Sequence, residues 1–204
     1  MSIMTSASEL DQATVHEISI GNQNANSMAV VEKIFGVIPS GYNKLCTSNQ
    51  KNYAVFTIEN DAHHNFITVT SIEITKTKPP QNCVLTKKPI SFAGITPGMY
   101  QPEIEGIFNS KGYKKAVITP KYVTYEKRSI ETATCHHYPE SEYDQEYYAY
   151  GSNEHIVSFT LSDLKSGMFN SVTKRLGYNF VPSNNDQCQT RNKSLQRSTG
   201  VPVE

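Results

Sequence analysis

Hydrophobic and polar residues alternate along two neighbouring stretches of the chain, Tyr53–Glu59 and Phe66–Thr75, which are also rich in β-branched and aromatic residues. This period of two is typical of strands with one buried face. A polar segment, residues 60–65, separates the two stretches, and the pattern therefore predicts a β-hairpin. In Ser27–Gly36 the hydrophobic residues recur at helical spacing instead, so a short amphipathic helix ending at Gly36 is expected there.

The second half of the chain shows a comparable order of patterns. Pro102 is suited to the first turn of a helix, where its missing N–H costs nothing, and this helix is expected to end near Lys111. The other elements predicted here are strands at Tyr122–Glu126 and Ser129–Cys135, a closing hairpin of Tyr147–Tyr150 and Ile156–Leu161 around a turn at Gly151–Glu154, and a short helix over Ser162–Leu176.

Two parts of the chain resemble copies of one unit. Val31–Phe35 aligns with Ile104–Phe108, and Gly21 aligns with Gly94 at the same offset. The duplication predicts an α+β fold made of two related units, each with a short helix and an antiparallel β-sheet. The expected domain boundaries are a flexible N-terminus over residues 1–15, a first unit over 16–78, a second unit over 79–181 and a polar C-terminal tail over 182–204.

The charges balance, since 19 Lys and Arg residues face 19 Asp and Glu residues. A chain without a global positive field is a poor candidate for nucleic-acid binding. No apolar run is long enough to span a bilayer. The first residues lack the basic and apolar regions of a secretory signal. We therefore expect either a cytoplasmic protein or a periplasmic or secreted one whose signal peptide is absent from this sequence.

The four cysteines help to choose between these compartments. Cys46, Cys83, Cys135 and Cys188 are even in number, widely spaced and never arranged as C-x-x-C. This pattern favours two disulfides in an oxidising compartment over a zinc site, with free buried thiols as the alternative. Four cysteines allow three connectivities, and the duplication favours one bond in each half, Cys46–Cys83 and Cys135–Cys188.

The segment Ile95–Phe108 contains Gly98, Met99, Glu103, Ile104 and Ile107 in the pattern G-M-[ST]-x-x-[DE]-[VI]-x-x-[IL], apart from the third position. This pattern resembles the helix opening of small outer-membrane assembly lipoproteins of the BamE/SmpA type. Two tandem copies of a similar unit build the β-lactamase inhibitor proteins. The resemblance covers about 14 residues by motif and implies a helix-plus-sheet unit in an envelope binding or inhibitor protein.

Histidine pairs at His63–His64 and His136–His137 are the candidates for a metal site. Neighbouring residues of a strand point to opposite faces, so one pair rarely supplies two ligands to the same ion. The alternative is that these are surface loop histidines, and no cofactor is expected. The chain also lacks the G-x-S-x-G, P-loop, H-E-x-x-H and dinucleotide-binding motifs, and an enzyme is therefore not predicted.

A tyrosine- and acid-rich passage, Tyr138–Tyr150, is the strongest candidate for a binding surface. Tyrosine provides large, rigid contact area, and acidic side chains attract a basic partner. The alternative is that the tyrosines are ordinary sheet residues and the acids keep a sheet edge soluble. The predicted partner-binding residues are Tyr138, Glu140, Glu142, Tyr143, Asp144, Glu146, Tyr147, Tyr148 and Tyr150.

These patterns predict a non-catalytic extracytoplasmic bacterial binding protein, similar to an inhibitor or a toxin-neutralising immunity protein. It would occlude another protein, such as a toxin or an enzyme with a basic surface. The first alternative is an envelope assembly or scaffold component that pairs through a sheet edge. The second is a metal-dependent hydrolase that uses the histidine pairs. The oligomeric state is not predicted.

Overall fold

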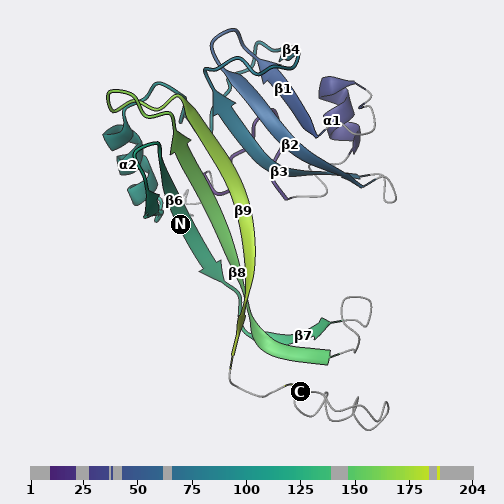
Figure 1. The fold of residues 1–204 in the computed structure, drawn as a ribbon. Coiled ribbons are helices and arrows are strands. Elements are labelled where there is room, and N and C mark those ends of the chain that lie inside the picture. The colour runs from purple at the N-terminus through teal and green to yellow at the C-terminus, as the bar shows by residue number, and fades with distance from the viewer. Residues whose placement is uncertain are drawn as a thin grey trace, which may run out of the picture. The chain divides into compact units, whose positions relative to one another are not determined.

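The computed structural model describes residues 10–21, 28–36, 38, 43–61, 66–138, 147–183 and 188 (Figure 1). Two helices lie in these residues, α1 (Met28–Phe35) and α2 (Gln101–Ser110). The strands are β1 (Lys44–Ser48), β2 (Tyr53–Asp61), β3 (Phe66–Thr75), β4 (Val84–Leu85), β5 (Lys114–Ile118), β6 (Tyr122–Ile130), β7 (Thr134–Tyr138), β8 (Tyr147–Ser162) and β9 (Ser171–Pro182).

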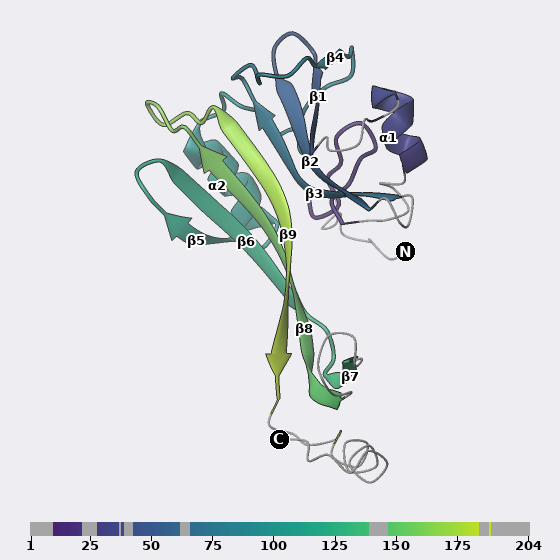
Figure 2. The same cartoon turned by 45° about the vertical axis from the view of Figure 1, so that its right-hand side comes forward.

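The nine described strands belong to one mixed sheet. Its order is β4-β1-β2-β3-β9-β8-β6-β5, and β7 pairs with β8 beside this path. β4 pairs with β1 in parallel, whereas the pairs β1–β2, β2–β3, β3–β9, β5–β6 and β7–β8 are antiparallel. β4 and β5 are therefore the edge strands at the two ends of this order, and Figure 2 shows β5 beside β6 at its edge.

The predicted α+β fold of two helix-plus-sheet units is wrong. The described residues are mostly β-strand, with helices of only 8 and 10 residues. The expected units were to have a sheet each, yet β3 pairs directly with β9, with Ile72 opposite Lys174 and Ile74 opposite Val172. Because this pairing joins strands from both halves of the sequence, the duplication does not describe how the chain builds its sheet.

Four elements with strong local patterns were predicted correctly. The helix α1 lies where the spacing of hydrophobic residues predicted it, and α2 lies where Pro102 predicted a first turn. The strands β2 and β3 form the expected antiparallel hairpin. Gly36 follows α1 with a φ of 77°, a left-handed conformation that suits glycine after a helix. Pro102 occupies the first turn of α2. The buried Phe108 of α2 stacks on Tyr125 of β6, with ring centroids 4.7 Å apart.

Three predictions in the second half are wrong. The strand expected over Ser129–Cys135 is interrupted, because β6 ends at Ile130 and β7 begins at Thr134. Gly151–Glu154 is not a turn, because β8 continues through it as one strand of 16 residues. The short helix expected over Ser162–Leu176 is replaced by a tight turn and the first half of β9. In that turn Ser166 and Gly167 both have positive φ, and Lys165 and Met168 bridge across them. This geometry is typical of a two-residue hairpin turn.

The structure divides into two compact units. Unit 1 comprises Met1–Lys127 and Val157–Leu176, and unit 2 comprises Arg128–Ile156 and Gly177–Glu204. The hydrophobic core lies in unit 1, where Phe92, Phe108, Tyr113, Tyr125 and Phe159 are almost fully buried. The boundary expected from sequence at residues 78 and 79 falls inside unit 1.

Residues 10–15, which the sequence assigned to a flexible N-terminus, contribute to the core of unit 1. Leu10, Ala13 and Val15 are buried, with relative exposures of 6% or less. The sequence pattern missed this because the segment lacks the length of a helix or strand. Its apolar side chains are stabilised by burial in a core that includes residues from distant parts of the chain.

Both disulfides form the pairs that the sequence favoured. Cys46 is bonded to Cys83 in unit 1, and Cys135 is bonded to Cys188 in unit 2. Disulfides persist in oxidising compartments such as the periplasm and the extracellular space. The two bonds therefore fit a protein that folds outside the cytosol.

Candidate binding surface

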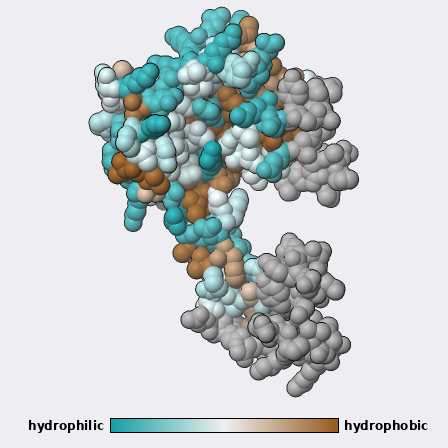
Figure 3. Space-filling model, viewed as in Figure 1, coloured by the Kyte–Doolittle hydropathy of each residue, from teal (hydrophilic) through white to brown (hydrophobic). Residues whose placement is uncertain are grey.

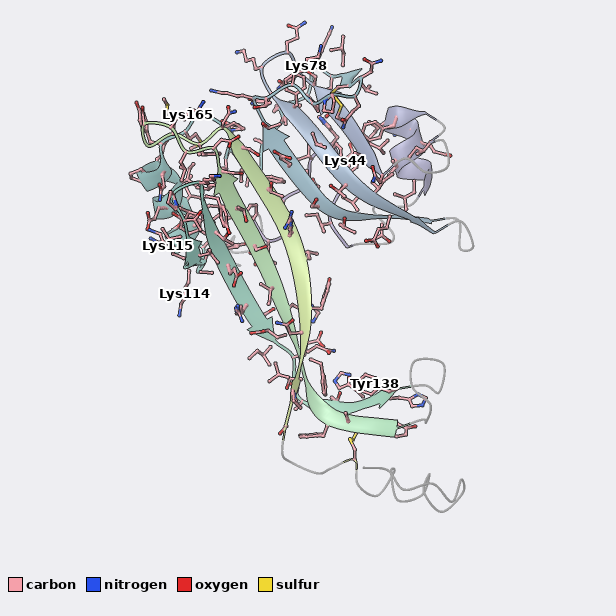
Figure 4. All side chains as sticks on the ribbon, viewed as in Figure 1. Lys44, Lys78, Lys114, Lys115, Tyr138 and Lys165 are labelled. Atoms are coloured by element: carbon pink, nitrogen blue, oxygen red, sulfur yellow. A yellow bond between two sulfur atoms is a disulfide. The ribbon has the colours of Figure 1, made fainter. Side chains whose placement is uncertain are left out.

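The antiparallel hairpin β7–β8 of unit 2 contains the described part of the predicted binding passage. Tyr138 lies at the end of β7, opposite Tyr147 of β8 (Figure 4). Tyr148 and Tyr150 follow on β8, opposite His137 and Cys135. The other predicted partner-binding residues, Glu140, Glu142, Tyr143, Asp144 and Glu146, and the side chain of Tyr147, lie outside the described residues.

One face of this hairpin presents His137, Tyr148 and Tyr150, which we call the tyrosine face. The rings of His137 and Tyr148 are stacked, with centroids 4.8 Å apart and an interplanar angle of 21°. Tyr150 lies two residues beyond Tyr148, so its side chain points to the same face. His137 is exposed, and the two tyrosines are partly exposed. The face is therefore accessible to a partner, and stacking restrains the rings of His137 and Tyr148.

Cys135, which forms a disulfide with Cys188, also lies on the tyrosine face. Cys135 is directly opposite Tyr150 in the strand register. Residues directly opposite each other on antiparallel strands share a face of the sheet. The covalent bond therefore ties residue 188 to the hairpin beside Tyr150 and limits the movement of this part of the strand.

The opposite face carries a second set of aromatic rings. His136 and Tyr138 both contact Phe180 of β9 edge to face, with centroid distances of 4.9 and 6.1 Å. Gly151 makes room for this ring, because a Cβ atom at Gly151 would lie 2.3 Å from Phe180. The predicted tyrosines are thus divided, since Tyr138 lies on the Phe180 face and Tyr148 and Tyr150 lie on the tyrosine face.

A polar network continues along the strands of unit 2. Glu131 Oε1 lies 2.8 Å from His155 Nε2, and Asn153 Nδ2 donates to Glu131 Oε2 at 3.1 Å. Hydrogen bonds from Asn153 and then from His155 lower the pKa of the Glu131 carboxyl. The ring of Tyr178 contacts His155 edge to face at 4.9 Å. These groups are on the surface, where the network orients the side chains of Glu131, Asn153 and His155.

Neighbouring histidines of β7 point to opposite faces, as their contacts with Phe180 and Tyr148 demonstrate. His136 and His137 therefore do not converge on one ion. Within the described residues no three His, Cys, Asp or Glu side chains are grouped in a way that would hold a metal. His63 and His64 lie outside the described residues.

Sequence reasoning missed Phe180 and Tyr178, whose rings pack on His136, Tyr138 and His155, away from the tyrosine face. Both belong to β9, whose end overlaps the predicted polar tail at residue 182. Their spacing of two residues is a strand signal that places both rings on one face. Hydrophobic surface is visible on unit 2 in Figure 3. Two hydrophobic residues of this unit, Ile130 and Val181, are exposed by 66% and 43%.

Comparison with protein-family models, with curated proteins and with solved structures found no match to this chain. None of the helices in the described part of the chain has the length and apolar character needed to cross a membrane.

Proposed function

We propose that this chain is a non-catalytic extracytoplasmic bacterial binding protein that occludes a partner protein, as an inhibitor or a toxin-neutralising immunity protein does. The tyrosine face provides the contact. The observation that carries the proposal is the stacked pair His137–Tyr148 beside Tyr150 on a hairpin with a disulfide, where His137 is exposed and both tyrosines are partly exposed. Rigid amphipathic rings of this kind are enriched among the residues that dominate binding energy.

The charge distribution supports a basic partner. Residues 129–164 contain seven acidic residues and no Lys or Arg. A region of one sign attracts a partner of the opposite sign and raises the association rate at low salt. The pairing of Tyr150 with Cys135 also supports binding, because a restrained surface loses less conformational entropy when it meets its partner.

The two disulfides support an extracytoplasmic location, and the resemblance of Ile95–Phe108 to a BamE-type helix opening agrees with the bacterial envelope. In this proposal the protein acts in the periplasm or after secretion.

Affinity capture from envelope and secreted fractions of the source organism tests the proposal. The full-length wild-type chain is compared with the double variant Tyr148→Ala, Tyr150→Ala and with Tyr178→Ala. Tyr178 is a matched control, because it is 60% exposed in the same unit but contacts His155 away from the tyrosine face.

A genuine partner should be retained by wild type and by the Tyr178 variant. It should bind the double variant at least tenfold more weakly, because tyrosine hot spots contribute about 2 kcal/mol or more each. Mass spectrometry without reductant checks that both disulfides survive in each variant. Equal capture by all three proteins would exclude the tyrosine face as the binding site.

One observation favours a second candidate function, that of an assembly component which pairs through a sheet edge. All five residues of the edge strand β5 are exposed, including Val117 and Ile118 at 41% and 70%. An exposed edge can add a strand from another chain. A partner lost on Val117→Lys, Ile118→Lys but kept by the tyrosine double variant would favour this function.

A further inference from the structure

A groove of about 700 Å³ lies at the β4 end of unit 1, far from the hairpin in sequence. One wall is the β1–β2 turn, residues 49–51, and the other is formed by residues 85–87 and Pro89. We call it the lysine groove, after Lys51 and Lys87. β4 is the last strand at this end of the sheet, so no further strand of the described sheet covers its outer edge.

Both walls are held in place by local bonds. Asn49 Oδ1 accepts hydrogen bonds from the backbone N–H groups of Lys51 and Asn52, at 3.2 and 2.9 Å. On the other wall, the N–H of Thr86 donates to the carbonyl of Ser48 at 2.8 Å. The Cys46–Cys83 disulfide joins β1 to the residue before β4. The groove is therefore preformed, which lowers the entropy cost of binding a ligand.

The charge of the groove is uniformly positive. None of its lining residues is acidic, and residues 74–102 contain four lysines and no acidic residue. Lys88 is paired with Glu17 at 3.4 Å. In the described part of the chain no carboxylate lies within ion-pair distance of Lys51 or Lys87, so both cations remain available. Figure 3 shows mainly hydrophilic surface at this end of the unit.

The groove also offers apolar contact. Leu85 is 75% exposed at its wall, and Pro89 lines it as well. An inorganic anion would contact neither Leu85 nor Pro89 and would fill little of the groove. The volume of the groove lies in the range of pockets that bind larger ligands. An extended peptide of a few residues can place carboxylates at the lysines and an aliphatic side chain against Leu85.

We propose that the lysine groove binds an acidic peptide segment, with one aliphatic residue between its carboxylates, presented by another protein. The main chain of the segment hydrogen-bonds to the side chains of Asn49 and Gln50, and its carboxylates pair with Lys51 and Lys87. This site is independent of the tyrosine face, and the tyrosine double variant should bind the peptide normally.

Fluorescence anisotropy with the labelled peptide Asp-Glu-Leu-Glu-Asp tests the proposal on the full chain with its disulfides intact. The uncharged peptide Asn-Gln-Leu-Gln-Asn is the reference ligand. Binding of the acidic peptide should be at least tenfold tighter than that of the reference and should weaken as salt increases. The double variant Lys51→Gln, Lys87→Gln should lose at least tenfold in affinity.

Lys114→Gln is the matched control, since this lysine is exposed on β5 at the other edge of the sheet (Figure 4). It should leave the affinity within twofold of wild type. Far-UV circular dichroism confirms that the variants are folded. The proposal is overturned by equal binding of the two peptides, by an equal loss in the Lys114 variant, or by full competition from equimolar inorganic phosphate. It is also overturned if sedimentation shows that the wild-type chain dimerises and that the double variant Lys51→Gln, Lys87→Gln does not.

Discussion

Lys174 donates a hydrogen bond of 2.6 Å from Nζ to the backbone carbonyl of Asp11, across 163 positions of sequence. A second bond, of 3.0 Å, reaches the carbonyl of Ala13. Lys174 is only 2% exposed, and Asp11 and Ala13 lie in the segment that contributes Leu10 and Val15 to the core. The buried ammonium group therefore fastens the N-terminal segment to the sheet of unit 1, because it donates to two backbone carbonyls of that segment.

The first prediction concerns the pH dependence of stability. Burial lowers the pKa of Lys174 to about 8, against the opposing charge of Asp11, whereas its ordinary value is 10.5. Between these values the unfolded chain binds more protons than the folded one, so stability increases with pH. The free energy of unfolding in urea should rise by roughly 1 kcal/mol between about pH 7 and pH 9.

The variant Lys174→Met is the control for this prediction, because it has similar length and no titrating group. Its free energy of unfolding should lack the rise that wild type shows. If both proteins show the same slope, some other group causes it and the assignment to Lys174 is wrong.

The second prediction concerns the hydroxyl group of Tyr113. It donates to Asp11 Oδ1 at 2.6 Å, while Lys127 Nζ lies 2.5 Å from the other carboxylate oxygen. Burial, together with this bond and the charge of Asp11, raises the pKa of Tyr113 well above 10. Tyr113→Phe keeps the ring contacts with Phe108 and Phe159 but removes the donor. It should cost about 1–3 kcal/mol in the free energy of unfolding, because the Asp11 carboxylate loses one of its two partners.

Asp11→Asn in the Tyr113→Phe background separates the two partners. Once the tyrosine donor is gone, the further loss should reflect the pair with Lys127 and the attraction of the carboxylate to Lys174, and it should stay below the loss in the wild-type background. Additive losses in this double-mutant cycle would show that the Tyr113 hydroxyl and the Asp11 carboxylate are not coupled.

Local patterns predicted the elements whose stability is decided locally. The helix α1 and the hairpin β2–β3 follow from hydrophobic spacing, and Pro102 marks the first turn of α2. β8 was misread because Gly-Ser-Asn-Glu has the composition of a turn. Here β8 is extended because Gly151 pairs with Thr134 of β7 and the Asn153 carbonyl accepts from the N–H of Glu131. Gly151 also packs on Phe180, 29 positions away, and no local pattern relates these residues. The burial of Lys174 could not be predicted from local patterns either, because its two acceptors are backbone carbonyls more than 160 positions away.

The candidate surface was predictable in composition but not in geometry. Tyr138, Tyr148 and Tyr150 were identified by their density in the sequence. The division of these tyrosines between two faces follows from the register of β7 and β8, which places Tyr148 opposite His137. A one-residue slip of this register would reverse the faces, and the sequence of the connecting residues did not specify it.

The third prediction concerns the Cys46–Cys83 disulfide. The bond joins residues 37 positions apart and holds β4 and the lysine groove to β1. Replacing both cysteines by serine should lower the free energy of unfolding by about 3–4 kcal/mol, because the unfolded chain regains the entropy of an open loop. Urea unfolding with and without reductant provides the measurement, and wild type in reductant should approach the variant. A loss below about 1 kcal/mol would show that the native contacts of β4 hold it without the bond.

The fourth prediction uses two glycines in contrasting surroundings. A Cβ atom at Gly151 would lie 2.3 Å from the Phe180 ring and 2.6 Å from the carbonyl oxygen of Val181, so Gly151→Ala must displace β9. This overpacking should destabilise the strand pair by about 1–3 kcal/mol.

Gly106 lies exposed in α2 with nothing within 4 Å of its Cβ position, and Gly106→Ala should stabilise the helix by about 0.5–1 kcal/mol. Hydrogen exchange of the peptides covering residues 147–156 and 101–110 measures each effect where it arises. The packing of Phe180 on Gly151 would be refuted if exchange in residues 147–156 were as slow in Gly151→Ala as in wild type.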